Sequence, residues 1–353
     1  MESNKFNINF LSEENVKKNV LPIYNLENAK ITKIKFKDSD KQRAVYKVDY
    51  INTSYCLKKV YFSINDLLFV YSAIEWFFRN GINVPRILPT KEKSRFVNYK
   101  NMLFILTPWV NGLKCDYDNT NHMISSISNL ALMHKVSTNF IPINGSSNRN
   151  GFENLYYSTS KHLKQLLLCS NLAFKYKDTF SNIFLQYFSQ NIELCQTAEK
   201  IASTINTKML NKALCHSDYV NKNIIVDESN KIWVIDFDKC KMDYAVHDIS
   251  YFLRRFLKRD NTQWDIKTAI DTLNNYESIK SLNINEYKAI LVYLAFPQKY
   301  WKISKDYYNN INKCNKNSFI VLMKKANEQN ESHIQFVNEM IKYLEDKFNE
   351  KLL

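Results

Sequence analysis

Glycine is scarce in this chain of 353 residues, which contains only 4 Gly and 6 Pro. So few glycines exclude collagen-like repeats, glycine-rich linkers and the glycine-rich turn of dinucleotide-binding folds. Hydrophobic residues make up 45% of the chain and aromatic residues 14%, which is enough to build a core and excludes wholesale disorder. A chain of this length predicts two domains or lobes around a shared cleft.

Long apolar runs are also missing. No stretch reaches the roughly 18 apolar residues of a membrane span, and the segment from Met1 to Phe10 does not read as a secretory signal. We therefore expect a chain that is made and folded in the cytoplasm. The seven cysteines are odd in number, scattered and free of any C-x-x-C pair, which argues against a disulfide framework or a zinc site.

The charge is strongly positive, with 49 Lys+Arg against 35 Asp+Glu and a formal net charge of +14. The lysines are spread singly rather than in a dense block, and Lys, Asn and Ile are abundant while Arg and Gly are scarce. That pattern is typical of coding bias in an AT-rich genome. It disfavours a specific nucleic-acid partner but leaves ATP or an acidic partner open.

The pattern along the chain predicts an α+β fold with two lobes. A small β-rich N-lobe, residues 1–107, holds an antiparallel sheet and one helix, and a larger, mainly helical C-lobe, residues 108–353, holds the hinge, the segment 213–238 and a helical tail. The alternation and the turn signals predict strands at 43–50, 55–62 and 102–107, a hairpin turn at 52–54, helices at 65–79, 124–136 and within 152–212, a β-like insertion at 223–236, and helices over most of 245–353.

The segment from Ala213 to Asp238 carries the chemistry. It contains His-x-Asp-x-x-x-x-Asn, and Asp236 follows Asp218 by 18 residues in Ile-Asp-Phe-Asp. Phosphoryl transfer from ATP needs a base near the acceptor hydroxyl and hard oxygen ligands for Mg²⁺. Asp218 can be the base or orienter, while the amide of Asn223 and the carboxylate of Asp236 can hold the metal. A hairpin that pairs residue 227 with 230 places 223 opposite 234, and so brings Asn223 close to Asp236.

These residues resemble the kinase-like phosphotransferases of the choline/aminoglycoside group, and more closely the CotS family of endospore coat proteins. The resemblance covers nearly the whole chain, and its tail motifs are more specific to that family than the catalytic ones. The similar segments are Leu-Cys-His-Ser-Asp-Tyr (214–219) with Asn223, Val-Ile-Asp-Phe-Asp (234–238), Asp243, Asp248, Phe-Leu-Arg-Arg (252–255), Trp-Asp (264–265), Phe-Pro-Gln-Lys-Tyr-Trp (296–301) and Asp-Tyr-Tyr (306–308), and upstream 55–58, 78–85, 109–112 and 130–134.

The resemblance implies a protein-kinase-like fold that uses ATP and Mg²⁺. A lysine on the third strand would hold the phosphates; Lys58 and Lys59 point to opposite faces, and the family pattern favours Lys58. Its expected partner is Glu75, a carboxylate on a mainly apolar helix face.

The resemblance also suggests how adenine and the remaining acids are used. Adenine would receive a backbone hydrogen bond at the hinge from Trp109 or Val110, because Pro108 has no N–H. Asp238 would be a secondary metal ligand. We expect Asp248 to be structural and to bond the catalytic loop, and His216 to brace that loop.

Two features depart from the resemblance. Related kinases often cover the ATP phosphates with a glycine-containing loop between their first two strands, but the segment 31–43 has no glycine and the first in the chain is Gly81. Ser39, Lys41 and Arg43 are the side chains there that could contact phosphate instead. Ser217 stands where the broader group has glycine. The missing glycine predicts weak ATP binding rather than a different fold.

Two functions follow as hypotheses. The first is a CotS-like spore coat protein that transfers the γ-phosphoryl group of ATP to a hydroxyl acceptor. The second is a catalytically weak or inactive kinase-like protein that serves coat assembly. In both, the chain is made in the mother-cell cytoplasm, lies in the endospore coat and has other coat proteins as partners. Nothing in the segments that would build an acceptor pocket identifies the acceptor.

Overall fold

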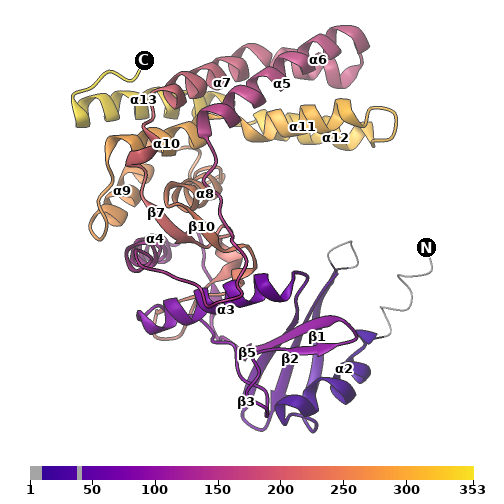
Figure 1. The fold of residues 1–353 in the computed structure, drawn as a ribbon. Helices are drawn as coiled ribbons and strands as arrows, with labels where there is room; N and C mark the ends of the chain where they lie inside the picture. Colours follow the sequence, from indigo (N-terminus) through magenta and orange to yellow (C-terminus); the bar gives the residue numbers. More distant parts are fainter. Residues whose placement is uncertain (1–9, 38–41) are drawn as a thin grey trace. The chain divides into compact units, whose positions relative to one another are not determined.

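The computed structural model describes residues 10–37 and 42–353, and the chain separates into two compact units. The first unit comprises Met1–Cys115, Asn139–Arg149 and Asn221–Cys240, and the second comprises the remaining segments, Asp116–Thr138, Asn150–Val220 and Lys241–Leu353. The first is small and β-rich and the second larger and helical (Figure 1), which confirms the α+β class. The segment Asn221–Cys240 groups with the β-rich unit, although the sequence assigned it to the C-lobe.

A five-stranded antiparallel sheet forms the first unit, in the order β1-β2-β3-β5-β4. The strands are β1 (Lys30–Lys37), β2 (Arg43–Tyr50), β3 (Thr53–Lys59), β4 (Val97–Tyr99) and β5 (Met102–Pro108). The strand predicted at 43–50 is confirmed. The hairpin turn differs from the prediction, because Tyr50 pairs with Thr53 and the turn is Ile51-Asn52 rather than 52–54. Ile51 adopts the positive φ of 53° that such a two-residue turn requires.

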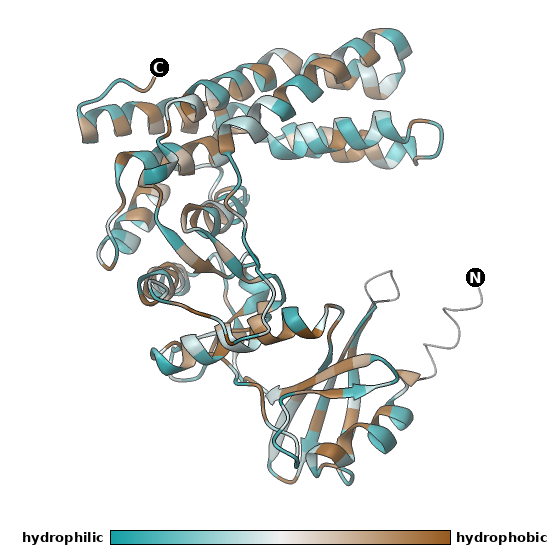
Figure 2. Cartoon of the chain, viewed as in Figure 1, coloured by the Kyte–Doolittle hydropathy of each residue, from teal (hydrophilic) through white to brown (hydrophobic). Residues whose placement is uncertain are grey.

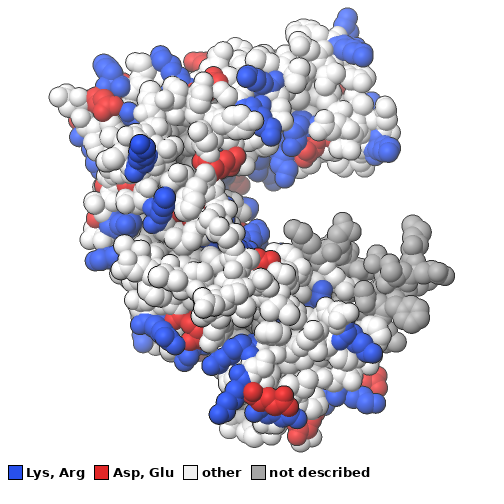
Figure 3. All heavy atoms as spheres, viewed as in Figure 1, with Lys and Arg blue, Asp and Glu red and all other residues white. Residues whose placement is uncertain are grey.

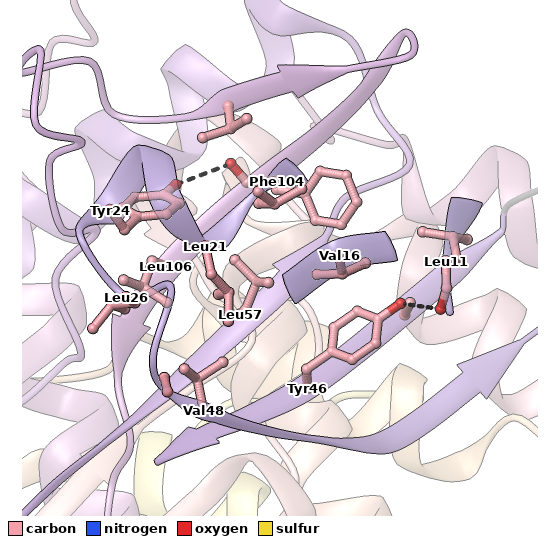
Figure 4. Close-up of a cluster of buried hydrophobic side chains, with 14 of the residues drawn as sticks. Leu11, Val16, Leu21, Tyr24, Leu26, Tyr46, Val48, Leu57, Phe104 and Leu106 are labelled. Atoms are coloured by element: carbon pink, nitrogen blue, oxygen red, sulfur yellow. Dashed lines mark hydrogen bonds between the residues drawn. The ribbon is translucent and has the colours of Figure 1, made fainter. Parts of the chain in front are cut away.

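The N-terminal segment packs against this sheet and completes its core. Helix α2 (Glu13–Asn19) begins at Ser12, whose side chain caps the Asn15 N–H, and the short helix η1 (Leu21–Tyr24) follows. Tyr46 donates a hydrogen bond of 2.6 Å to the Leu11 carbonyl, and both residues are buried among aliphatic side chains (Figure 4). The sheet therefore has a covered apolar face, which the sequence pattern did not indicate.

Helix α3 (Ile64–Arg79) confirms the helix predicted at 65–79. Ser63 caps its start, and Gly81 lies just beyond its end with a φ of 80°. Its buried side chains include Phe69, Phe77 and the carboxylate-bearing Glu75. Figure 2 shows apolar residues along this helix and along the strands of the sheet.

A second, three-stranded sheet of the first unit has the order β6-β8-β9, with β6 (Leu113–Lys114), β8 (Ile224–Val226) and β9 (Ile232–Val234). Its hairpin pairs Ile224 with Val234, so the register differs by one residue from the predicted pairing of 223 with 234. The Asp227 N–H bonds to the Lys231 carbonyl, and Asn230 takes a left-handed φ of 58°, so the loop holds three residues instead of two.

The second unit is mostly helical around a two-stranded antiparallel ribbon of β7 (Lys212–Cys215) and β10 (Lys241–Tyr244). Helix α4 (Thr120–Val136) contains the predicted helix at 124–136, and the region predicted as helical over 152–212 splits into three helices followed by β7. Helices α5 and α7 pack together, and α11 packs on α5 and α12 (Figure 1). The helices after α4 are α5 (Leu155–Tyr176), α6 (Thr179–Gln186), α7 (Phe188–Ser203), α8 (Val246–Leu257), α9 (Ile266–Glu277), α10 (Ile284–Ala295), α11 (Gln298–Asn309), α12 (Lys316–Asn327) and α13 (Asn330–Phe348).

Two further properties concern possible membrane spans and the distribution of surface charge. Within the described residues, no helix joins the length and the apolar character needed to cross a membrane. On the face drawn in Figure 3, cationic and anionic groups are interspersed rather than gathered into one basic block.

Candidate functional site

Lys58 lies at the centre of an acidic cluster in the first unit. Its ammonium Nζ is 2.6 Å from Asp236 Oδ1 and 2.7 Å from Asp238 Oδ1. Burial acts to lower the pKa of Lys58, but Asp238 and Asp236 outweigh burial and raise it. Lys59 points to the other face of β3 and donates instead to the Gln42 carbonyl at 2.7 Å. Of the two candidate lysines, Lys58 is the one that meets the acids of the Ile-Asp-Phe-Asp motif.

Glu75 has a different partner from the one expected. Its carboxylate accepts two hydrogen bonds from Arg86, at 2.9 Å from Nε and 2.7 Å from Nη2, while Lys58 bonds the two aspartates. The expected Lys58–Glu75 pair is therefore wrong for this structure. A guanidinium matches a carboxylate with two parallel hydrogen bonds, and Asp236 and Asp238 offer Lys58 two charges instead of one. Arg86 itself follows Pro85 and carries no spacing signal that points to Glu75.

The hairpin brings the proposed metal ligands together by its backbone. The Ile235 N–H donates to the Asn223 carbonyl at 3.0 Å, so Asn223 lies opposite the residue before Asp236. Asp236 has a left-handed φ of 67° and starts the short helix η4 (Phe237–Lys239), which carries Asp238. The predicted proximity of Asn223 and Asp236 holds despite the shifted register, because a shift of one residue still leaves them at the same end of the hairpin.

The donor set suits a magnesium ion. Asn223 and Asp238 are buried, at 4% and 3% exposed, and the Asp236 side chain is about one-third exposed. Oδ2 of Asp238 is buried and has no hydrogen-bond partner in the described part of the chain. Carboxylate and amide oxygens are the ligands that Mg²⁺ prefers. Arg149 adds a constraint that the sequence did not reveal, because its Nη2 donates to the Asp238 carbonyl at 2.6 Å.

The hinge segment narrows the choice of adenine donor. The Trp109 N–H donates to the Ser54 carbonyl at 3.0 Å and so continues the β3–β5 ladder. Val110 is then the better of the two candidates for a hydrogen bond to adenine. In the segment expected to cover the phosphates, Ser39 and Lys41 lie outside the described residues, and the guanidinium of Arg43 lies 3.9 Å from the centre of the Tyr61 ring.

The candidate catalytic loop, residues 216–220, belongs to the second unit and follows β7. Asp248 on α8 accepts hydrogen bonds from the backbone N–H groups of His216, at 2.6 Å, and Ser217, at 2.8 Å. His216 Nδ1 in turn accepts the Asp218 N–H at 3.2 Å. The expected structural roles of Asp248 and His216 are confirmed. Ser217 has a φ of 59°, which explains why this position suits glycine.

Asp218 is 6% exposed and lies beside a tyrosine that sequence reasoning missed. The Tyr251 hydroxyl is 3.4 Å from Asp218 Oδ1, and Arg255 donates to the same hydroxyl at 2.9 Å. Tyr251 stands three residues after Asp248 on α8, and such residues share a helix face. That spacing could have identified it.

Asp243 anchors a second polar cluster of the second unit, on β10. Its Oδ2 is 2.6 Å from His247 Nδ1 and 2.7 Å from Lys241 Nζ, and the carboxylate is fully buried. Burial acts to raise the pKa of Asp243, but His247 and Lys241 outweigh burial and lower it. The Lys241 contact lies within β10, whereas the His247 contact links β10 to the start of α8, so Asp243 joins the strand to the helix.

Solved structures identify the fold as kinase-like. The chain resembles an aminoglycoside phosphotransferase from Alicyclobacillus acidocaldarius, with a TM-score of 0.78 and 16% identity over 93% of this chain and 96% of that one. It also resembles a spectinomycin phosphotransferase solved with ADP and spectinomycin, with a TM-score of 0.67 and 17% identity over 94% and 98% of the two chains. These likenesses confirm the predicted kinase-like fold with a small β-sheet region and a larger helical part.

Sequence comparison identifies the family. Residues 38–282 match the phosphotransferase enzyme family, and the chain belongs to it. A curated relative, the 3-deoxy-D-manno-octulosonic acid kinase of Vibrio parahaemolyticus, is 38% identical over 64 residues. That match covers 17% of this chain and 26% of the kinase, so the chain matches about a quarter of the length of that relative.

Proposed function

We propose that this protein is an ATP- and Mg²⁺-dependent phosphotransferase that moves the γ-phosphoryl group to a hydroxyl acceptor. The observation that carries the proposal is the bonding of Lys58 to both Asp236 and Asp238. A cation beside two carboxylates, with an amide oxygen at the same end of the hairpin, is the set that phosphoryl transfer uses. The solved relatives include a spectinomycin phosphotransferase with ADP and an amicoumacin kinase with AMP-PNP and Ca²⁺, which supports a nucleotide donor.

Each residue has a distinct role in this proposal. Asn223, Asp236 and Asp238 would hold magnesium, which when bound would neutralise charge on the β- and γ-phosphates. Lys58 would pair with the α- and β-phosphates, and Val110 would donate to adenine. Asp218 would orient the acceptor hydroxyl and take its proton as the oxygen bonds to phosphorus, with ADP leaving.

The loop geometry supports that role for Asp218. Two charge-assisted hydrogen bonds from His216 and Ser217 to Asp248 limit the movement of the loop backbone. The backbone N–H of Asp218 is itself bonded to His216, and the carboxylate Oδ1 lies 3.4 Å from the Tyr251 hydroxyl. A positioned base of this kind contributes about 10²–10⁴-fold to a rate.

Calorimetry with ATP and Mg²⁺ tests the proposal directly. Wild type should bind MgATP, Asp236→Ala should bind it at least tenfold more weakly, and Asp346→Ala, at an exposed position on α13, should match wild type. Turnover should disappear in Asp218→Ala while MgATP binding persists. No binding by folded wild type at millimolar MgATP would sink the proposal.

A second candidate, an assembly protein of the endospore coat, is favoured by the CotS-like motifs at 252–255, 264–265, 296–301 and 306–308. In that function the chain would be made in the mother cell, and its partners would be other coat proteins. The absence of glycine from the segment 31–43 supports a catalytically weak form. Spores that carry Asp218→Ala or Asp236→Ala separate the two functions: normal coat assembly and resistance favour an assembly role, and loss of both with a folded variant favours catalysis.

A further inference from the structure

Three lysines line a small cavity of about 90 Å³ in the second unit. None of the residues that line it belongs to the loop of residues 216–220. It lies among α7, the end of α8, the start of α11, the end of α12 and the start of α13, and Lys258, Lys299 and Lys325 are among its lining residues. A water molecule needs about 10–15 Å³ of such space, so the cavity has room for several waters or one small oxyanion but not for a nucleotide.

Lys258 is the half-buried lysine of the three. Within the described residues, its ammonium has no carboxylate at ion-pair distance, and its nearest aromatic contact is the Trp264 ring, with Nζ 5.4 Å from the ring centre. Burial, followed by the neighbouring cations Arg254, Lys299 and Arg255, lowers the pKa of Lys258 to about 7. A half-buried ammonium among like charges is costly unless an anion compensates it.

Two helix starts lie at the same cavity. Helix α11 begins after Pro297 and α13 begins after Gln329, and neither start is capped by a side chain. Residues of both first turns, Lys299 and Asn330, line the cavity. The Gln298 N–H of α11 already donates to the Phe296 carbonyl at 2.8 Å, so what both starts offer an anion is the positive end of the helix dipole.

The opposing groups do not cancel this charge. Asp260 and Glu328 also line the cavity, but both are exposed, and Asp260 accepts a hydrogen bond from Gln329 at 3.4 Å. His333 stacks on Trp264 with ring centres 4.0 Å apart, and burial lowers the pKa of His333 to about 3, so the imidazole is neutral. The positive charge at the cavity therefore comes from Lys299 and Lys325 and, in the fraction of molecules that is protonated there, from Lys258, whose charged form an anion would stabilise.

We infer that this cavity binds a phosphate-sized oxyanion, either free or as the phosphate group of a small metabolite, through Lys258, Lys299 and the first turns of α11 and α13. Trp264 forms its apolar wall. The segments 264–265 and 296–301, which have no role in the proposed phosphoryl transfer, supply Trp264 and Lys299 to the site. The inference stands apart from the proposed function, because it requires no turnover.

Phosphate titration of the full chain at constant ionic strength tests the site. Wild type should show a saturable rise in Tm and a calorimetric binding isotherm with inorganic phosphate, since a ligand stabilises the state that binds it. Lys258→Met should weaken phosphate binding at least tenfold. Lys324→Met is the matched control, because Lys324 is exposed on α12 next to Lys325 and does not line the cavity.

Two further arms keep the test decisive. If Lys258→Met does not fold, Lys299→Met at an exposed position should weaken phosphate binding several-fold in a folded protein. Phosphate held at the candidate phosphotransfer site would respond to Lys58→Met and not to Lys258→Met, and that result would overturn the inference, as would the absence of saturable binding. Tighter binding of glycerol phosphate than of inorganic phosphate, again dependent on Lys258, would identify a phosphorylated metabolite as the source.

Discussion

Lys58→Met should destabilise the first unit by about 2–4 kcal/mol. The substitution removes the ammonium charge of Lys58 but keeps most of the side-chain volume. Asp236 and Asp238 would then face each other without the ammonium that now lies 2.6 and 2.7 Å from them. Their mutual repulsion adds to the loss of attraction.

The magnitude follows from the burial of each partner. Breaking a buried ion pair by removing one side costs about 3–5 kcal/mol. The Asp238 side chain is 4% exposed and should incur that cost, whereas the Asp236 side chain is 31% exposed and can recover part of its hydration. Water access to Asp236 therefore reduces the expected loss from about 3–5 kcal/mol to about 2–4 kcal/mol.

Urea unfolding followed by tryptophan fluorescence measures the effect, with Lys59→Met as the matched control. Lys59 is the neighbouring lysine on β3, but its Nζ contacts a backbone carbonyl and no carboxylate. Its replacement should cost less than about 1.5 kcal/mol, the net value of an ordinary hydrogen bond. The double variant Lys58→Met/Asp238→Asn should recover part of the loss, because it removes one of the two unpaired charges.

The pH dependence has a definite sign. The pKa of Lys58 is raised in the folded protein above its ordinary value of 10.5, so its contribution is complete below about pH 10.5 and is lost as the pH rises through the folded value. The stability difference between wild type and Lys58→Met should therefore stay constant from about pH 6 to pH 9. Mg²⁺ should stabilise Lys58→Met more than wild type. Equal stability of the two proteins without Mg²⁺ would refute the reasoning.

Three further substitutions probe other parts of the fold and site. Gly112→Ala should cost about 2–4 kcal/mol in urea unfolding, because φ is 144° and the new Cβ would lie 2.4 Å from the Val226 carbonyl oxygen; a loss under 1 kcal/mol would contradict this packing. Asp248→Asn should lower kcat at least tenfold in a protein with unchanged circular dichroism, because the loop N–H groups lose a charged acceptor, and an unchanged kcat would argue against loop positioning. Glu75→Gln should cost less than about 1 kcal/mol in free energy of unfolding, since the Arg86 side chain is 41% exposed. A coupling energy above that value in a double-mutant cycle with Arg86→Met would contradict this prediction.

Much of the site was predictable because its spacing is local. The strand alternation separated Lys58 from Lys59, and the structure places them on opposite faces of β3 as expected. The hairpin brought Asn223 and Asp236 together even though the loop was one residue longer than predicted. That error came from Asn230, which takes a left-handed conformation that the pattern of apolar residues does not signal.

The ion-pair partners were less predictable, because they depend on groups distant in sequence. Glu75 could be recognised as a carboxylate that needs a cation, but the sequence pointed to Lys58 and gave no signal for Arg86. The segment after α3 brings Arg86 to Glu75, and only the structure shows this. The bond from Arg149 to the Asp238 carbonyl is of the same kind, since 89 residues separate the two.

The sequence by itself determined the α+β class, the nearness of Asn223 to Asp236 and the scattering of single lysines without a dense basic block. Those features rest on periodicity and short spacing, which local backbone geometry enforces. Only the tertiary structure decided that Lys58 bridges two aspartates, that Glu75 pairs with Arg86 and that Lys258 and Lys299 share a cavity. These outcomes depend on which side chains packing brings within hydrogen-bond distance, and the free energy of a buried charge depends on all of its neighbours at once.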